Sequence, residues 1–170
     1  MNAVCLVAHP DDCVIFGYSY MYHHPEMNWT VAYLTYQAHQ PRALEFVQFW
    51  GRRNIPVRFI GLEDHWHDQE QGCFTRWPDQ DAMQQCWQLA KDYDLVLTHD
   101  EHGDYGHIHH KLVHNAVKHH PQLVTFAPPG QGKTYTLPKD AYSLDELLLH
   151  GDIVKSFHQN QHSNSYKELL

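Results

Sequence analysis

The sequence predicts a single α/β domain built on a Rossmann-like, doubly wound and mostly parallel sheet. Three observations support this prediction. The chain has 170 residues, which is the length of one ordinary domain. Segments with the pattern of strands alternate along it with segments that have the pattern of amphipathic helices. The first strand candidate, residues 4–8, is a continuous apolar run, which is typical of a parallel strand buried on both faces.

Six segments are expected to form strands because they are short, apolar and rich in β-branched or aromatic residues. They are residues 4–8, 29–36, 57–62, 95–98, 123–127 and 134–137. Helices are expected between the strands, where apolar residues recur every three or four positions. They are residues 12–23, 41–53, 81–92, 107–119 and 144–157. Residues 63–79 form a polar loop in this prediction, and we expect one domain at 1–158 followed by a loosely held polar tail at 159–170.

The composition excludes several classes of partner. Twelve Lys and Arg residues face 20 Asp and Glu residues, so the net charge is −8 with histidine neutral. This acidic balance argues against binding to nucleic acid or to an anionic membrane surface, because both need a basic footprint. No apolar run approaches the length of a membrane span, and the N-terminus lacks the features of a secretory signal. We therefore expect a cytoplasmic location, and the 17 histidines predict a charge that changes steeply between about pH 5.5 and 7.

Three ionisable side chains follow the first predicted strand, in the sequence His9-Pro10-Asp11-Asp12. Buried carboxylates need a hydrogen-bond partner or a cation, so this grouping at the end of a buried strand points to a site. The alternative is a simple turn in which Asp12 caps the helix that follows.

A second group of possible ligands follows the fourth predicted strand, at residues 98–110. His107 and His110 are three positions apart, which places them on one face of the helix predicted there. Because the carboxyl ends of parallel strands gather at one edge of a sheet, we expect His9, Asp12 and His110 to meet. Two histidines and a carboxylate are the ligands of a catalytic zinc site that keeps a position open for water.

The two motifs together resemble those of a known family. Ala-His-Pro-Asp-Asp at 8–12 and Tyr-Gly-His-x-x-His at 105–110 are similar to motifs of the PIG-L/LmbE-like zinc-dependent N-acetylglucosamine deacetylases. The resemblance runs in order from His9 to about His110. It implies the metal ligands His9, Asp12 and His110, zinc as the cofactor with Fe²⁺ as the alternative, and a small N-acetylated amino sugar of the GlcNAc type as the substrate.

The resemblance also implies roles for five other residues. Asp11 matches the general base, and His107 matches the histidine that stabilises the tetrahedral intermediate, for which we expect the protonated form. Tyr105 matches a mobile active-site tyrosine of some members. Arg42 is similar to an arginine on the substrate side. Asp64 is similar to a carboxylate that contacts sugar hydroxyls.

The chain departs from the family pattern in three places. Ile108 and His109 stand where the family usually has a proline and an aspartate. If that aspartate orients a catalytic histidine, His109 cannot do so as an anion. The usual glycine and acid after the second strand are missing from residues 35–39. The C-terminal half is also shorter than in typical members, which affects substrate specificity more than the metal site.

Three other patterns have simpler explanations. Residues 127–134 end like a phosphate-binding loop, but two prolines intrude and no helix follows. His110 and His114 have the spacing of a zinc protease, but Lys111 stands where that motif needs a glutamate. His114 is better explained as a packed histidine, and residues 65–68 as a specificity loop.

Two alternatives to sugar deacetylation stay open at this point. The same site could cleave a different amide, in a thiol conjugate, a secondary metabolite or a modified nucleobase. The chain could also be a non-catalytic metal- or sugar-binding module, or a metal-storage surface. Asp11 argues against a binding module, since such a module has no need of a base beside the metal.

Overall fold

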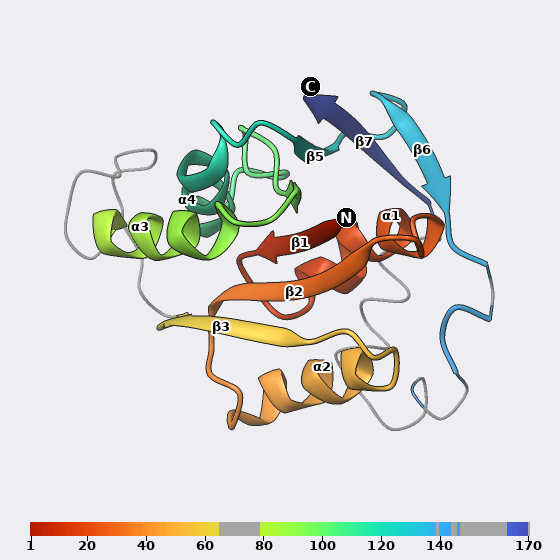
Figure 1. Ribbon diagram of the computed structural model, residues 1–170, viewed down its shortest axis with the longest axis horizontal. Coiled ribbons are helices and arrows are strands. Elements are labelled where there is room, and N and C mark those ends of the chain that lie inside the picture. The colour runs from red at the N-terminus through yellow and green to blue at the C-terminus, as the bar shows by residue number, and fades with distance from the viewer. Residues whose placement is uncertain (65–78, 139, 144–145, 147–162, 170) are drawn as a thin grey trace.

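Seven strands form one sheet at the centre of the molecule, with helices on both of its faces (Figure 1). The computed structural model describes residues 1–64, 79–138, 140–143, 146 and 163–169. The strands are β1 Asn2–Val7, β2 Asn28–Thr35, β3 Val57–Leu62, β4 Leu95–Thr98, β5 Leu123–Ala127, β6 Lys133–Thr136 and β7 Ser163–Leu169. The helices are α1 Tyr18–His23, α2 Pro41–Gly51, α3 Asp79–Ala90 and α4 Ile108–Val117, with a π-helical segment, Cys13–Gly17, just before α1. The doubly wound α/β fold expected from the sequence is confirmed.

The sheet separates two apolar cores, because successive side chains of a strand point to opposite faces. On β1, Ala3, Cys5 and Val7 belong to the core under α1 and α2. The alternate residues of β1 pack on the other face, against α3 and α4. A strand buried on both faces must be apolar throughout, which explains the continuous run at its position in the sequence.

The strand order places the first two motifs of the sequence side by side. The order is β3-β2-β1-β4-β5-β7-β6, and β1 pairs in parallel with both β2 and β4. The chain therefore winds outward from β1 to β3, returns, and winds outward again from β4. Between β1 and β4 the winding direction changes, and in such sheets ligands bind outside the carboxyl ends of the strands at that point. The segments that follow β1 and β4 are the two histidine- and aspartate-rich motifs.

Two expectations for the secondary structure need correction. Residues 163–169 do not form a loosely held tail, because β7 pairs antiparallel with β5 and β6 and buries Tyr166. The helix expected at residues 12–23 begins as the π-helical segment, and α-helical geometry starts only at Tyr18. The helix expected at 144–157 and the loop at 65–78 lie outside the described residues, apart from Glu146. Within the described chain, no helix is both long and apolar enough to cross a membrane.

Gly17 allows the π-helical segment to lie close against β1. A Cβ atom added at Gly17 would stand 2.7 Å from the Sγ of Cys5, which is fully buried. We therefore expect Gly17→Ala to lower the free energy of unfolding by about 1–3 kcal/mol through overpacking. Gly51→Ala is the matched control, because nothing lies within 4 Å of its Cβ position. It should leave stability unchanged or raise it by up to about 1 kcal/mol. Urea unfolding of both variants measures the difference, and equal stabilities would contradict the close approach.

A candidate metal centre between the β1 and β4 loops

The turn after β1 is closed by its own hydrogen bonds. The backbone N–H of His9 donates to Asp12 Oδ2 at 2.8 Å, and the N–H of Asp12 donates to the carbonyl of His9 at 3.2 Å. The carbonyl of Ala8 accepts from both the N–H and the hydroxyl of Thr35, so the end of β2 holds the turn in place. Pro10 has no N–H to satisfy and fixes the backbone between the two ligand candidates.

His9, Asp12 and His110 come together below the mouth of a cavity, as the sequence predicts. His9 Nδ1 lies 3.1 Å from Asp12 Oδ2, and His110 Nε2 lies 3.2 Å from the same oxygen. The two imidazole nitrogens are 3.3 Å apart. Ligand atoms about 2.0–2.1 Å from a tetrahedral zinc ion are about 3.3–3.4 Å apart, so this triangle has the size of a zinc ligand set. All three residues are buried, with exposures of 7%, 3% and 0%, so the donors are already desolvated.

The outer nitrogen of His110 is held by Asp104. His110 Nδ1 donates to Asp104 Oδ2 at 2.8 Å, and His99 Nδ1 donates to the same oxygen. His99 in turn accepts the N–H of Ala8 on its Nε2 at 3.0 Å, and its ring stacks on that of His110 with centroids 3.8 Å apart. These bonds keep a proton on Nδ1 of His110, so that Nε2 is the nitrogen directed toward Asp12 and His9 and can bind a metal once it loses its proton.

A second carboxylate lies behind His9. Asp64 Oδ1 is 3.2 Å from His9 Nε2, and Asp64 Oδ2 accepts from the hydroxyl of Tyr36 at 2.6 Å. His109 Nδ1 also lies 3.2 Å from His9 Nε2. Both metal-facing histidines therefore have their outer nitrogen beside a carboxylate, which is the usual way that proteins orient histidine ligands.

The charges at this centre are strongly coupled. Burial alone would lower the pKa of His9, but its hydrogen bonds to Asp12 and Asp64 raise it to about 9. Burial acts in the same direction on His110, and the charge of Asp12 with the bond to Asp104 raises that pKa to about 9. Burial would raise the pKa of the Asp12 carboxyl, but the neighbouring imidazoles hold it well below its usual range. The group thus stabilises positive charge beside Asp12, and a divalent cation can replace its protons.

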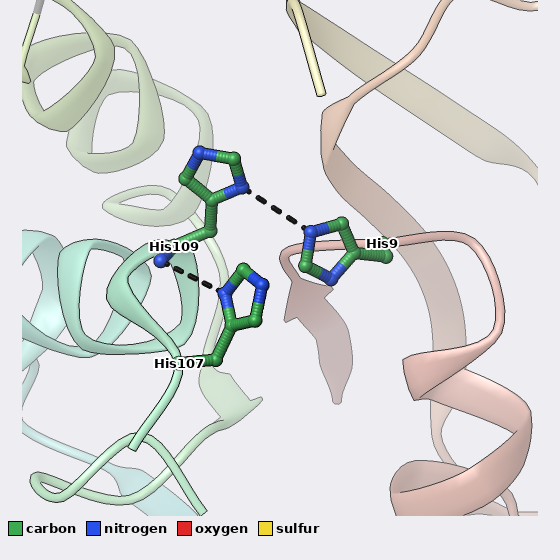
Figure 2. Close-up of side chains that lie close together, drawn as sticks. All are labelled: His9, His107 and His109. Carbon is green, nitrogen blue, oxygen red and sulfur yellow. Dashed lines mark hydrogen bonds between the residues drawn. The ribbon is translucent and has the colours of Figure 1, made fainter. Parts of the chain in front are cut away.

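His107 stands at the N-cap of α4 and lies near this centre. Its Nδ1 accepts the backbone N–H of His109 at 3.2 Å, so the proton of the neutral ring belongs on Nε2 (Figure 2). Figure 2 shows that this other nitrogen faces His9, whose ring centroid is 4.7 Å from that of His107. Burial and the nearby His110 lower the pKa of His107 to about 4. The protonated His107 expected from the sequence is therefore not favoured, and the ring is a neutral N–H donor.

The remaining residues expected at the site surround the same cavity. Arg42 Nη2 donates to Asp11 Oδ2 at 2.8 Å, and Arg42 Nη1 donates to the hydroxyl of Tyr36 at 3.1 Å. Burial and the charge of Asp12 raise the pKa of Asp11, and Arg42 opposes that rise. Tyr105 is 68% exposed at the rim. The cavity has a volume of about 530 Å³ and is lined by His9, Asp11, Asp12, Ile15, Phe16, Arg42, Asp64, Tyr105 and His107.

Four residues of the site had no assigned role in the sequence prediction. Asp104 and His99 hold His110, Tyr36 holds Asp64, and His109 contacts His9. In the family pattern, an aspartate at position 109 would orient a catalytic histidine. Here the backbone N–H of His109 orients His107, because it donates to Nδ1 of that ring. Two further groups in the described chain have metal-ligand spacing, namely His9 with His107 and His109, and His99 with Asp104 and His110. The second is explained by the hydrogen bonds of Asp104, and the first lacks a carboxylate among its three members.

The fold and the site together define an α/β protein with a two-histidine, one-carboxylate centre at the switch point of its sheet. The family model of PIG-L, described as GlcNAc-PI de-N-acetylase, matches residues 4–120. The chain therefore belongs to the PIG-L family.

One curated relative and several solved structures are similar to the chain. An uncharacterized protein of Acanthamoeba polyphaga mimivirus is 30% identical over 139 residues, which cover 74% of this chain. The match spans 61% of the length of that relative. The hydratase GalB of Pseudomonas putida, which acts on 4-carboxy-2-hydroxymuconate, has a TM-score of 0.63 at 12% identity, over 99% of this chain and 96% of its own. A deacetylase mutant from teicoplanin biosynthesis has a TM-score of 0.59 at 11% identity, over 95% and 82%. The N,N'-diacetylchitobiose deacetylase of Pyrococcus horikoshii has a TM-score of 0.58 at 9% identity, over 99% and 83%. At these identities the structures show a shared fold.

We expect Asp104→Asn to weaken zinc binding about 10–100-fold, because it removes the carboxylate that orients His110. Asp104 has a φ of +62°, a conformation that asparagine tolerates, so the loop backbone should stay intact. Competition with a chromophoric chelator measures the affinity. Glu101→Gln, an exposed change in the same loop, is the control and should bind zinc like the unmodified protein. An unchanged affinity in Asp104→Asn would show that His110 does not depend on this contact.

Proposed function

We propose that the protein is a metal-dependent hydrolase that removes the N-acetyl group of an amino sugar of the GlcNAc type, with zinc at His9, Asp12 and His110. The family match supports this proposal, and the observation that carries it is the position of Asp11. Its carboxylate lies next in sequence to a ligand candidate, lines the same cavity and is held by Arg42 at 2.8 Å. A protein that only binds metal or sugar has no use for a base in this place.

The chemistry divides between the metal and the residues around it. When zinc is bound, it supplies a Lewis acid that makes water a nucleophile at neutral pH. Asp11 accepts the proton of the attacking water and later donates it to the departing amine. The raised pKa of Asp11 suits both steps, because a stronger base takes the proton more readily and its acid form can still give it up. The bond to Arg42 orients the carboxylate.

His107 donates a hydrogen bond to the amide oxygen as that oxygen gains negative charge. Its Nδ1 is occupied by the N–H of His109, so Nε2–H is the available donor and its direction is fixed by the helix cap. A neutral imidazole in this position stabilises an oxyanion without a change of protonation. Arg42 and Asp64 offer polar groups to the sugar on one side of the cavity, and the exposed Tyr105 stands at its rim.

The direct test is acetate release from GlcNAc conjugates by protein loaded with one equivalent of zinc, with a parallel sample loaded with Fe²⁺ under anaerobic conditions. Release that depends on metal supports the proposal. Release from other amides, but not from sugars, would show that the site serves a different substrate. Metal binding without any hydrolysis would favour a binding module.

Asp11→Asn should lower the rate of hydrolysis by about 10²–10⁴-fold, because an amide cannot accept the proton of water. Zinc stoichiometry should stay at one per chain, since Asp11 is not a member of the ligand triangle. Asp92→Asn, an exposed change at the opposite edge of the sheet, serves as the control. Full activity of Asp11→Asn in the initial rates would overturn the assignment of the base.

His107→Ala should lower the rate about 10²–10³-fold, and His107→Gln should recover part of that loss because its amide N–H can still donate. The pKa of His107 is lowered to about 4, so the ring stays neutral from pH 5 to 8 and a bound cation lowers the pKa further. We therefore expect that His107 causes no loss of activity as the pH rises through 6.5. If the activity of the unmodified enzyme falls as the pH rises through 6.5, and that of His107→Gln does not, the protonated form of His107 acts.

A further inference from the structure

A second hollow of about 380 Å³ lies beside the cavity at the metal centre, next to Phe16 and Tyr105. Its apolar lining comes from Phe16 before α1 and from the end of β5 and the loop after it, at Phe126, Ala127, Pro128 and Pro129. We name this the apolar groove. Phe16 and Tyr105 line both the groove and the cavity, so the two spaces adjoin at these side chains.

The aromatic side chains of the apolar groove lie close to the candidate metal centre. The rings of Phe16 and Phe126 stack with centroids 5.4 Å apart and form its floor. The Phe16 ring centroid is 6.4 Å from that of His110, and the Phe126 ring lies 5.3 Å from that of His99. An apolar chain attached to an atom at the metal centre would therefore reach aromatic surface within a few bonds.

Two carboxylates also line the groove, and they select against an anionic ligand. Asp104 is engaged by His99 and His110, and Asp100 Oδ1 accepts the backbone N–H groups of His102 and Asp104 at 2.8 Å. Both are held in the wall rather than presented as free hydrogen-bond partners. A further carboxylate beside these two would be repelled, and the aromatic and proline side chains of the lining suit an uncharged alkyl chain.

The opposite side of the cavity leads to a polar hollow of about 820 Å³. Asp64 and His107 line it, together with Tyr36, Gln37, His39 and Glu63. The two substituents of an amide bound at the metal centre would thus meet different surroundings. An amine carrying hydroxyl groups matches the polar side, which leaves the apolar groove for the acyl group.

We propose that the site also removes acyl groups longer than acetyl and favours them, with the uncharged alkyl chain seated on Phe16 and Phe126 between Tyr105 and the loop after β5. This rests on the proposed function, because it needs amide hydrolysis at the same centre. Water adds its oxygen to the acyl carbon, the C–N bond breaks, and the proton goes to the amine, so the products are a fatty acid and an amino sugar.

The test is kcat/KM for N-acetyl-, N-butyryl-, N-hexanoyl- and N-octanoylglucosamine with the zinc-loaded protein. Each fully buried CH₂ contributes about fourfold, so we expect N-hexanoyl to exceed N-acetyl by about tenfold or more in this half-open groove. Ala127→Phe fills the groove and should lower the hexanoyl-to-acetyl ratio at least about tenfold, and Pro128→Phe is a second variant should the first fold poorly. His39→Phe adds the same ring to the polar side and should leave that ratio unchanged. A ratio of one or less in the unmodified protein would overturn the inference.

Direct binding separates this inference from the proposed function. Titration calorimetry of the zinc-loaded protein should show octanoate binding about tenfold tighter than acetate, with the difference lost in Ala127→Phe. If no glucosamine amide is hydrolysed but octanoate is preferred, the sugar deacylase function fails and the groove assignment stands. If N-acetylglucosamine is hydrolysed and octanoate binds no better than acetate, the function stands and the longer acyl group is overturned.

Discussion

The site depends on the parallel pairing of β1 with β4. Val4 faces Val96 and Cys5 faces Leu97 in that ladder, so the two strands end side by side. Past the ladder, the Thr98 hydroxyl donates to the carbonyl of Leu6 at 2.7 Å, and the N–H of Ala8 donates to His99 Nε2 at 3.0 Å. These bonds extend the pairing into the two loops. If another strand took the place of β4 beside β1, His9 and Asp12 would lie far from His110.

The same arrangement explains why charge can be buried here. Asp12 is 3% exposed, and a carboxylate in that position needs a cation or several donors. Its own loop supplies one N–H, and the imidazoles of His9 and His110 supply positive charge when no metal is present. Asp104 and Asp64 then stabilise those imidazoles from behind. A divalent ion fits this centre because it replaces protons that the site already holds, and the carboxylates that held those protons go on orienting the ligands.

Much of this architecture follows from local sequence patterns. The continuous apolar run of β1 and the histidine spacing on α4 predict the sheet, its edge and the meeting of His9, Asp12 and His110. The hydrogen-bond partners behind them carry no comparable signal. Asp104 reaches two imidazoles from a loop position with a φ of +62°, and His109 acts on His107 through its backbone N–H. The strand β7 also could not be predicted from its pattern, since its sequence is mostly polar. Among its described side chains only Ser165 and Tyr166 are buried.

The fold by itself does not choose the reaction. A hydratase and two deacetylases share it at similar TM-scores, so the choice must come from the cavity. Asp11, Asp12 and Asp64 line that cavity, and Arg42 is the one guanidinium or ammonium group among its described lining residues. Arg42 already binds Asp11 at 2.8 Å. The positive charge of His9 and His110 is directed at Asp12, so the described lining offers a substrate with several carboxylates no guanidinium or ammonium group beyond the engaged Arg42. The neutral amide of the proposed function needs no such group, because in that proposal its oxygen is bound by the metal and by the N–H of His107. Its two substituents can then divide between the polar side and the apolar groove.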